Sequence, residues 1–267
     1  MIPKIIHYCW INKDKKEDFS IIVKECIKTW KDILPNYEIK EWNIDNFDIN
    51  INKYVREAYD AGKYAFVSDY IRLYVLYRYG GIYMDTDVKV VRSFDSLLNN
   101  KVFMGFESLD TIATCLIGAE KNNILIKEML RLYDNKNFKK ENGEYDCIPN
   151  TVLLTSLLKS YGIIINNMLQ KNDYITVYPK DYFCPLERLT GEVNITDNTF
   201  AVHLFNGSWL SKEEKERINL YKNYYTKFNF ILPKKMADGL AKLIATYKVE
   251  GYKGIAKRFN KKINKNR

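Results

Sequence analysis

Two aspartates, Asp85 and Asp87, stand one residue apart directly after an apolar run that ends at Met84. A strand points alternate side chains the same way, so both carboxylates can converge on one side where the strand ends. In open α/β sheets that strand end is where ligands bind. Mg²⁺ and Mn²⁺ prefer hard oxygen ligands and complete their shells with water and phosphate oxygens. The pair therefore indicates a site for a divalent cation and a diphosphate, although two aspartates alone would equally suit a polar turn that closes a strand.

A second pair of charged residues, Asp69 and Arg72, lies three residues apart in a stretch that is expected to be a buried helix. Residues 65–79 are apolar nearly all the way round and stop at Gly80 and Gly81, the usual C-terminal signal of a helix. Residues three apart on a helix share one face, and buried charges must be paired or liganded. The two side chains therefore form either a structural ion pair or a polar patch facing a cavity, where they could bind the hydroxyls of a sugar.

The rest of the pattern indicates the elements that hold these residues in place. Residues 2–11 are typical of a buried strand, 20–30 have the apolar spacing of a helix, and 37–42 alternate like a second strand. This order predicts an α/β sandwich with parallel strands. Further strands are expected at 102–107, 114–120, 175–179 and 199–205, and further helices at 124–133 and 151–162. Because no repeat or low-complexity linker is visible, residues 1–230 are expected to form one domain.

Residues 231–267 differ in composition and are expected to form a separate helical tail. The chain has 42 Lys and Arg against 33 Asp and Glu, but residues 234–267 hold 11 basic and 2 acidic residues, so the rest of the chain is neutral. Apolar residues from Met236 to Tyr247 keep helical spacing, and a break is expected at the glycines that follow. A basic amphipathic helix of this kind is typical of segments that bind an anionic membrane surface. The alternative is a solvated, partly disordered tail; charge confined to a tail argues against nucleic-acid binding.

The cysteines and the hydrophobic runs indicate in which cellular compartment the protein is expected. Five cysteines are scattered with no C-x-x-C pair, so neither a disulfide framework nor a zinc site is indicated, and a reducing cytosol fits best. The first residues lack a basic leader and a cleavage site, and no apolar run reaches the ~18 residues of a membrane span. We therefore expect a cytoplasmic protein that is neither secreted through a signal peptide nor membrane-spanning.

Three separated stretches together resemble one known family. They are IPKIIHYCWI, YAFVSDYIRLYVLYRYGGIYMDTDV and HLFNGSW, spread in this order over residues 2–210. The match is to the D-x-D sugar transferases (glycosyltransferase family 32), which include bacterial capsular polysaccharide glycosyltransferases and the yeast initiating α-1,6-mannosyltransferase. A more distant likeness is to the glucosyltransferase domains of clostridial toxins. The resemblance implies a nucleotide-binding α/β fold of the GT-A type, with a mostly parallel central sheet flanked by helices.

The resemblance also implies roles for residues near the aspartates. Trp10 would stack on the base of the donor, and Asp69 and Arg72 would grip the hydroxyls of the donor sugar. Asp85 would reach the ribose and metal-bound water, while Asp87 would bind the metal, Mn²⁺ or Mg²⁺, directly. The alternative for Trp10 is an ordinary place in the core.

Two further roles come from the C-terminal stretch of the match. His203, one of only 2 histidines, would be a third ligand of the metal, or else a structural residue. Ser208 and Trp209 would lie over the diphosphate of the donor, and Trp209 would act with the two aspartates in catalysis, because a donor aimed at the leaving phosphate stabilises charge that develops in the transition state. His7, inside the first strand, is expected to be structural.

The function implied is a retaining, metal-dependent glycosyltransferase that moves a hexose from a nucleotide-sugar, with UDP-hexose favoured, to a glycan or lipid-linked glycan in capsular or surface polysaccharide synthesis. Such an enzyme would be cytoplasmic and peripheral on the inner membrane face, held there by residues 234–267. The alternatives are a GDP-mannose-dependent mannosyltransferase and a non-catalytic carbohydrate-binding protein with a degenerate site. A nucleotidyltransferase or phosphohydrolase would also use paired aspartates, but the sequence shows no P-loop and no further acidic or histidine cluster.

Overall fold

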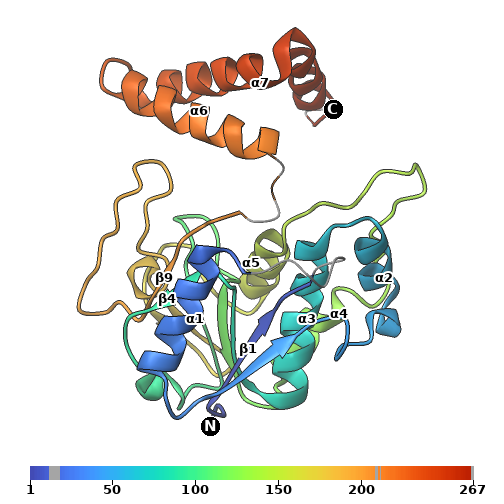
Figure 1. Cartoon of the computed structure of the whole chain (residues 1–267), viewed down its shortest axis with the longest axis vertical. Helices are drawn as coiled ribbons and strands as arrows, with labels where there is room; N and C mark the ends of the chain where they lie inside the picture. The colour runs from blue at the N-terminus through green and yellow to red at the C-terminus, as the bar shows by residue number, and fades with distance from the viewer. Residues whose placement is uncertain (12–18, 208–209, 211, 266–267) are drawn as a thin grey trace. The chain divides into compact units, whose positions relative to one another are not determined.

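The computed structural model describes residues 1–11, 19–207, 210 and 212–265 of the chain (Figure 1). The chain divides into two compact units. The first unit combines residues 1–186 with 194–205, and the second unit combines residues 187–193 with 206–267. Each unit is described by itself below.

The first unit is built on a central sheet. Seven strands within the described residues form it, in the order β2-β1-β3-β6-β5-β8-β7. These strands are β1 (Ile5–Cys9), β2 (Glu38–Trp42), β3 (Gly81–Met84), β5 (Val102–Gly105), β6 (Leu116–Ala119), β7 (Gln170–Lys171) and β8 (Thr176–Tyr178). The pairings run β1 parallel to β2 and β3, and β5 parallel to β8, while β6 and β7 run opposite to their neighbours. The predicted α/β fold with a mostly parallel central sheet is confirmed.

Helices cover both faces of this sheet (Figure 1). They are α1 (Ile21–Ile33), α2 (Lys53–Asp60), α3 (Tyr64–Tyr79), α4 (Ile124–Arg131) and α5 (Asn150–Ser160), with 3-10 turns at Ile49–Ile51, Asp95–Leu97 and Lys180–Tyr182. One core contains buried side chains of α2, α3, α4 and α5, and the other contains those of α1. Strand β3 contributes to both, because Tyr83 points into the first core while Ile82 and Met84 point into the second.

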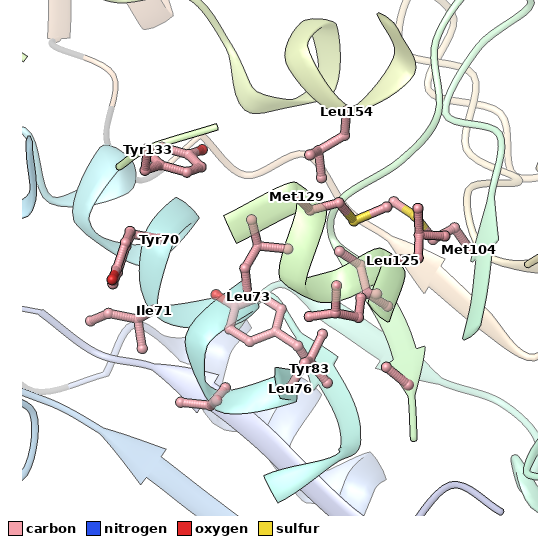
Figure 2. Packing of buried hydrophobic residues seen from close by; sticks show 14 of the residues in the cluster. Tyr70, Ile71, Leu73, Leu76, Tyr83, Met104, Leu125, Met129, Tyr133 and Leu154 are labelled. Atoms are coloured by element: carbon pink, nitrogen blue, oxygen red, sulfur yellow. The ribbon is translucent and has the colours of Figure 1, made fainter. Parts of the chain in front are cut away.

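The helix α3 is the centre of the first core, as its apolar sequence predicts. Figure 2 shows Leu73 of this helix lying toward Leu125 and Met129 of α4, while Ile71 lies on another side of the helix; Leu76 belongs to the same core. All of these side chains have no exposed surface. Polar residues on the buried sides of this helix are kept away from bulk water, whereas Arg78 in its last turn is exposed.

The junction between α3 and β3 is a tight turn made by two glycines. Gly80, with φ 68°, caps the helix by donating its N–H to the carbonyl of Leu76, and Gly81 has φ 104°. A Cβ atom on Gly81 would lie 2.6 Å from the carbonyl oxygen of Ile5 on β1. The strand can therefore leave the helix and pair with β1 at once only because both residues are glycine.

A short antiparallel ribbon follows directly after β3. It consists of β4 (Val88–Val90) and β9 (Ala201–His203), with Val88 opposite His203 and Val90 opposite Ala201. The indole N–H of Trp30 on α1 donates to the carbonyl of Val88 at 2.7 Å. The ribbon thus joins the region after β3 to a segment more than a hundred residues further along the chain.

Among the residues that the structure describes, the second unit contains two helices, α6 (Lys212–Asn229) and α7 (Lys234–Lys265), which pack against each other. Ala237, Ala241 and Ala245, four residues apart on α7, are buried. Arg217 of α6 pairs with Glu250 of α7 at 2.5 Å. The helix α7 bends at Gly251 (φ 63°, ψ −162°), where the sequence predicts a break.

The start of the predicted tail, residue 231, falls between α6 and α7, inside the second unit. The sequence patterns did not predict α6. Within the described residues, no helix is both long enough and apolar enough to cross a membrane.

Candidate active site

Asp85 and Asp87 lie in the turn that joins β3 to β4. The backbone N–H of Asp85 donates to the carbonyl of Cys115 at 2.8 Å, and its own carbonyl accepts from Val88 at 3.1 Å. The side chain of Asp85 is 28% exposed and that of Asp87 is 14% exposed. The predicted position of the pair at the carboxyl end of a buried strand is confirmed.

His203 is brought to the same place by the β4–β9 ribbon. Because Val88 stands opposite His203, the next residue, Leu204, donates its N–H to the carbonyl of Asp87 at 3.0 Å. The imidazole Nε2 then lies 3.3 Å from Oδ1 of Asp87. One ligand atom from each of Asp85, Asp87 and His203 lies within 4.8 Å of the others. The three residues predicted as metal ligands are thus gathered in one cluster, and their role as ligands stays a prediction.

Arg72 connects α3 to this cluster. Its guanidinium lies 3.1 Å from Asp69 and 3.2 Å from Asp85, and it donates to the carbonyl of Thr114 at 2.7 Å. The guanidinium carbon stands 4.8 Å above the ring of Tyr83. The sequence left open whether Asp69 and Arg72 form an ion pair or face a cavity; the ion pair is present, and it extends to Asp85.

The electrostatics of the cluster show an excess of negative charge. Burial raises the pKa of Asp69 to about 6 against the attraction of Arg72, and Asp85 adds to the rise. The pKa of Asp85 is also raised, first by burial, although Arg72 opposes the rise, and Asp87 increases it. Burial alone would lower the pKa of His203, but the Cys115 thiol and the Asp87 carboxylate beside it raise that pKa well above its usual range. The cluster is therefore one in which a positive charge is stabilised.

This cluster fits a divalent cation. Asp69 and Asp85 contact the buried guanidinium of Arg72, and Asp87 adds a further carboxylate beside Asp85 and His203. A divalent cation would balance the remaining negative charge, and carboxylate oxygens are the ligands that Mg²⁺ and Mn²⁺ prefer. Asp85, Asp87 and His203 are the residues that could hold it.

The remaining predicted residues stand at different places. Trp10 follows β1, the strand beside β3, at the same end of the sheet as Asp85, and its backbone N–H donates to the carbonyl of Trp42 at 2.9 Å. Its ring is partly buried and meets Phe19 edge-on, with 4.7 Å between the centroids. Ser208 and Trp209 lie outside the described residues.

Two residues of the site were missed by the sequence reasoning. Thr114 and Cys115 precede β6, and their backbone carbonyls accept from Arg72 and Asp85 respectively. Backbone acceptors leave no signal in residue type, so only the antiparallel pairing of β6 with β3 reveals them.

Comparison with known proteins bears on the same residues. Residues 22–104 match a family model described as the glycosyltransferase sugar-binding region containing the DXD motif. This range includes Asp69, Arg72, Asp85 and Asp87. Over these residues the chain is similar to the DXD glycosyltransferases. The resemblance predicted from the sequence is thereby confirmed.

Proteins similar to this chain include yeast proteins. Inositol phosphoceramide mannosyltransferase 3 of Schizosaccharomyces pombe is 31% identical over 134 residues, which cover 49% of this chain and 36% of that protein. Mannosyl phosphorylinositol ceramide synthase of Saccharomyces cerevisiae is 28% identical over 123 residues, which cover 45% of this chain and 32% of that protein. The chain therefore spans about a third of the length of these relatives.

Among solved structures, the PaToxG glycosyltransferase aligns with a TM-score of 0.44 and 23% sequence identity. The alignment covers 60% of this chain and 69% of that one.

Proposed function

We propose that this chain transfers a hexose from a nucleotide-sugar to a hydroxyl of a glycan or lipid-linked glycan acceptor. The observation that carries the proposal is the cluster at the carboxyl end of β3, where Asp85, Asp87 and His203 gather beside Arg72. Such a cluster suits a divalent cation, which when bound would act as a Lewis acid toward the departing diphosphate. Of the two predicted ions, Mn²⁺ is the better candidate, because an imidazole stands beside the two carboxylates.

Within this proposal the side chains of the chain position the reactants. Arg72 holds Asp85 in place, since its guanidinium is committed to Asp69, Asp85 and the Thr114 carbonyl. Asp69 uses Oδ1 for that pair, so we assign its Oδ2 to a hydroxyl of the donor sugar. Trp10 would stack on the base of the donor. The resemblance assigns Ser208 and Trp209 to the leaving diphosphate.

We propose that the configuration at the anomeric carbon is retained without a glycosyl-enzyme intermediate. A carboxylate nucleophile has to be available to attack. Here Asp69 and Asp85 are paired with Arg72, and Asp87 faces His203. The acceptor hydroxyl would then attack on the face of the leaving group and pass its proton to the diphosphate oxygen. A trapped glycosyl adduct on any of these aspartates would refute this step.

Two donor classes are proposed for testing. The sequence favours a UDP-hexose of capsular or surface polysaccharide synthesis. The yeast relatives are an inositol phosphoceramide mannosyltransferase and a mannosyl phosphorylinositol ceramide synthase, which favours a mannosyl donor and supports the alternative of GDP-mannose.

A thermal-shift panel distinguishes these donors. UDP, GDP, CDP and dTDP would each be added to the chain with Mn²⁺ or with EDTA. A ligand at about 100 times its dissociation constant stabilises the folded state by about 2.7 kcal/mol, so the matching nucleotide should raise the melting temperature only with Mn²⁺. The shift should vanish in Asp87→Ala and survive in Asp173→Ala, an exposed aspartate of the first unit. With no shift from any nucleotide, the carbohydrate-binding alternative would replace a transferase.

We also propose that the second unit binds an anionic membrane surface, which would place the enzyme peripherally on the cytoplasmic face. Phe230 is 92% exposed and Ile231 is 78% exposed, between α6 and α7. Lys227, Lys234 and Lys235 next to them are exposed as well. Apolar side chains flanked by lysines can enter the lipid boundary while the lysines contact anionic headgroups.

A further inference from the structure

His203 also belongs to a second group of possible metal ligands. Cys115, Cys184 and His203 each offer one ligand atom within 4.8 Å of the others. Their exposed fractions are 2%, 0% and 9%. The sulfur atoms of Cys115 and Cys184 are 3.7 Å apart. The sequence predicted no zinc site, because these three residues are far apart along the chain and form no local motif.

Backbone hydrogen bonds hold the three residues in place. The carbonyl of Cys115 accepts from the N–H of Asp85 at 2.8 Å, and the N–H of Cys184 donates to the carbonyl of Lys180 at 2.8 Å. The N–H of His203 donates to the carbonyl of Phe183, next to Cys184, at 3.1 Å. The arrangement of the donors is therefore set by the fold of the first unit, and a cation would find it largely preformed.

The imidazole of His203 distinguishes this cluster from two thiols packed in a core. Its Nε2 lies near Asp87, but its Nδ1 is buried and has no hydrogen-bond partner among the described residues. A buried polar atom without a partner destabilises the fold, so it calls for a ligand. The sulfur separation also suits one, because two thiolates on a tetrahedral Zn²⁺ at about 2.3 Å stand roughly 3.8 Å apart.

We propose that Cys115, Cys184 and Nδ1 of His203 form a binding site for a thiophilic divalent cation of the Zn²⁺ class. Two sulfur donors and an imidazole are a donor set of zinc rather than of Mn²⁺ or Mg²⁺. Both thiols release their protons to solvent when the cation binds. A histidine that ligates a metal usually donates its other ring N–H to a carboxylate, and here Nε2 stands 3.3 Å from Asp87.

Occupation of this site has a consequence for the proposed sugar-transfer site. With the cation on Nδ1, the Nε2–H of His203 donates to Asp87 and is withdrawn from the Mn²⁺ that Asp85 and Asp87 would hold. The thiophilic cation would thus weaken Mn²⁺ binding through a shared imidazole. The existence of the second site does not depend on sugar transfer, and it is tested without any nucleotide.

Co²⁺ titration of the reduced, full-length chain tests the site, because thiolate ligands give Co²⁺ a charge-transfer absorption that oxygen ligands do not. An excess of Mg²⁺ is included to fill the site of Asp85 and Asp87. We expect one Co²⁺ per chain with this absorption and its loss on addition of Zn²⁺. The absorption should weaken in Cys115→Ser and in Cys184→Ser and be absent from the double variant. Cys26→Ser, at a buried cysteine outside the cluster, should leave it unchanged.

Two results would overturn the proposal. One is the absence of charge-transfer absorption in the wild-type chain at full thiol content, a measurement that needs no variant to fold. The other is an absorption that persists in the double serine variant or in a Cys115→Ala, Cys184→Ala variant, each with a wild-type melting profile. As a positive check, Asp87→Asn should weaken Co²⁺ binding by about 10–100-fold without abolishing the absorption, since it removes the carboxylate behind His203.

Discussion

At the scale of single residues, Arg72 decides how the aspartates are arranged. It is 4% exposed, yet it meets Asp69, Asp85 and a backbone carbonyl at once. The sequence predicted the closeness of Asp69 and Arg72, because helical spacing is local. It did not predict the contact with Asp85, since that contact depends on how β3 turns back along α3.

Replacing Arg72 by Met should destabilise the protein by about 3–5 kcal/mol, because two partly buried carboxylates lose their buried partner while the volume is largely kept. Urea unfolding followed by tryptophan fluorescence measures this, as Trp30 and Trp42 are buried in the first unit. The exposed Arg78 on the same helix is the matched control, and Arg78→Met should cost about 0.5 kcal/mol or less. Equal costs for the two variants would contradict the role given to Arg72.

His7 predicts a pH dependence of stability. It is fully buried in β1, with Nε2 at 2.8 Å from the carbonyl of Gly80 and Nδ1 accepting from the indole of Trp42 at 3.1 Å. Burial lowers its pKa from 6.5 to about 4. Below pH 6.5 the unfolded chain binds a proton that the folded chain does not, so stability falls as the pH drops toward 4, by about 3 kcal/mol from this residue.

The measurement is the free energy of unfolding between pH 7 and pH 4 for the wild type and His7→Gln. The difference between the two chains should shrink by most of that amount as the pH falls. Other acidic groups affect both chains alike, so the comparison isolates His7. Parallel curves would show that His7 is already protonated in the fold or remains neutral when unfolded.

At the scale of elements, the sequence predicted most strands and helices but not how they pair. The strand of residues 199–205 was expected, and His203 was placed near its end. Its partner is β4, a three-residue strand whose pattern is too short to identify, and the register of Val88 with His203 is fixed by packing on α1. The prediction that His203 lies close to Asp87 therefore rested on the family resemblance and not on the hydrophobic periodicity of the sequence.

The α3–β3 junction should tolerate no side chain at its second glycine. Gly81→Ala places a Cβ 2.6 Å from the carbonyl of Ile5 in a backbone conformation with φ 104°, so we expect a loss of about 3 kcal/mol or more from strain and overpacking together. Gly62→Ala is the matched control, since it also has positive φ but no atom within 4 Å. It should cost about 1–2 kcal/mol, and the urea midpoints of the two variants give the comparison. A Gly81→Ala chain as stable as Gly62→Ala would show that β1 and β3 can separate at little cost.

At the scale of the whole molecule, the sequence located the change of composition near residue 231 but not the two compact units. The helix α6 was missed because no residue on it is buried among those described, so it carries no strong apolar period. The large apolar residues of α7, such as Met236 and Leu243, are exposed, and its alanines are buried instead. An amphipathic pattern predicts a helix, but it does not say which face meets a neighbouring helix.

The exposed turn between α6 and α7 leads to the prediction for membrane binding. Full burial of a large apolar side chain is worth about 1.5–3 kcal/mol, so replacing both Phe230 and Ile231 by Ser should weaken partitioning onto anionic vesicles by roughly 100-fold or more. The adjacent lysines should make wild-type binding fall as salt rises, since each contributes about 1 kcal/mol near such a surface.

Flotation with phosphatidylglycerol vesicles, compared with neutral vesicles, measures both effects. Leu109→Ser, at a residue of the first unit that is 75% exposed, controls for the general loss of apolar surface and should bind as the wild type does. If Leu109→Ser lost as much binding as the Phe230 and Ile231 variant, or if neutral vesicles bound equally well, the second unit would not be the membrane contact.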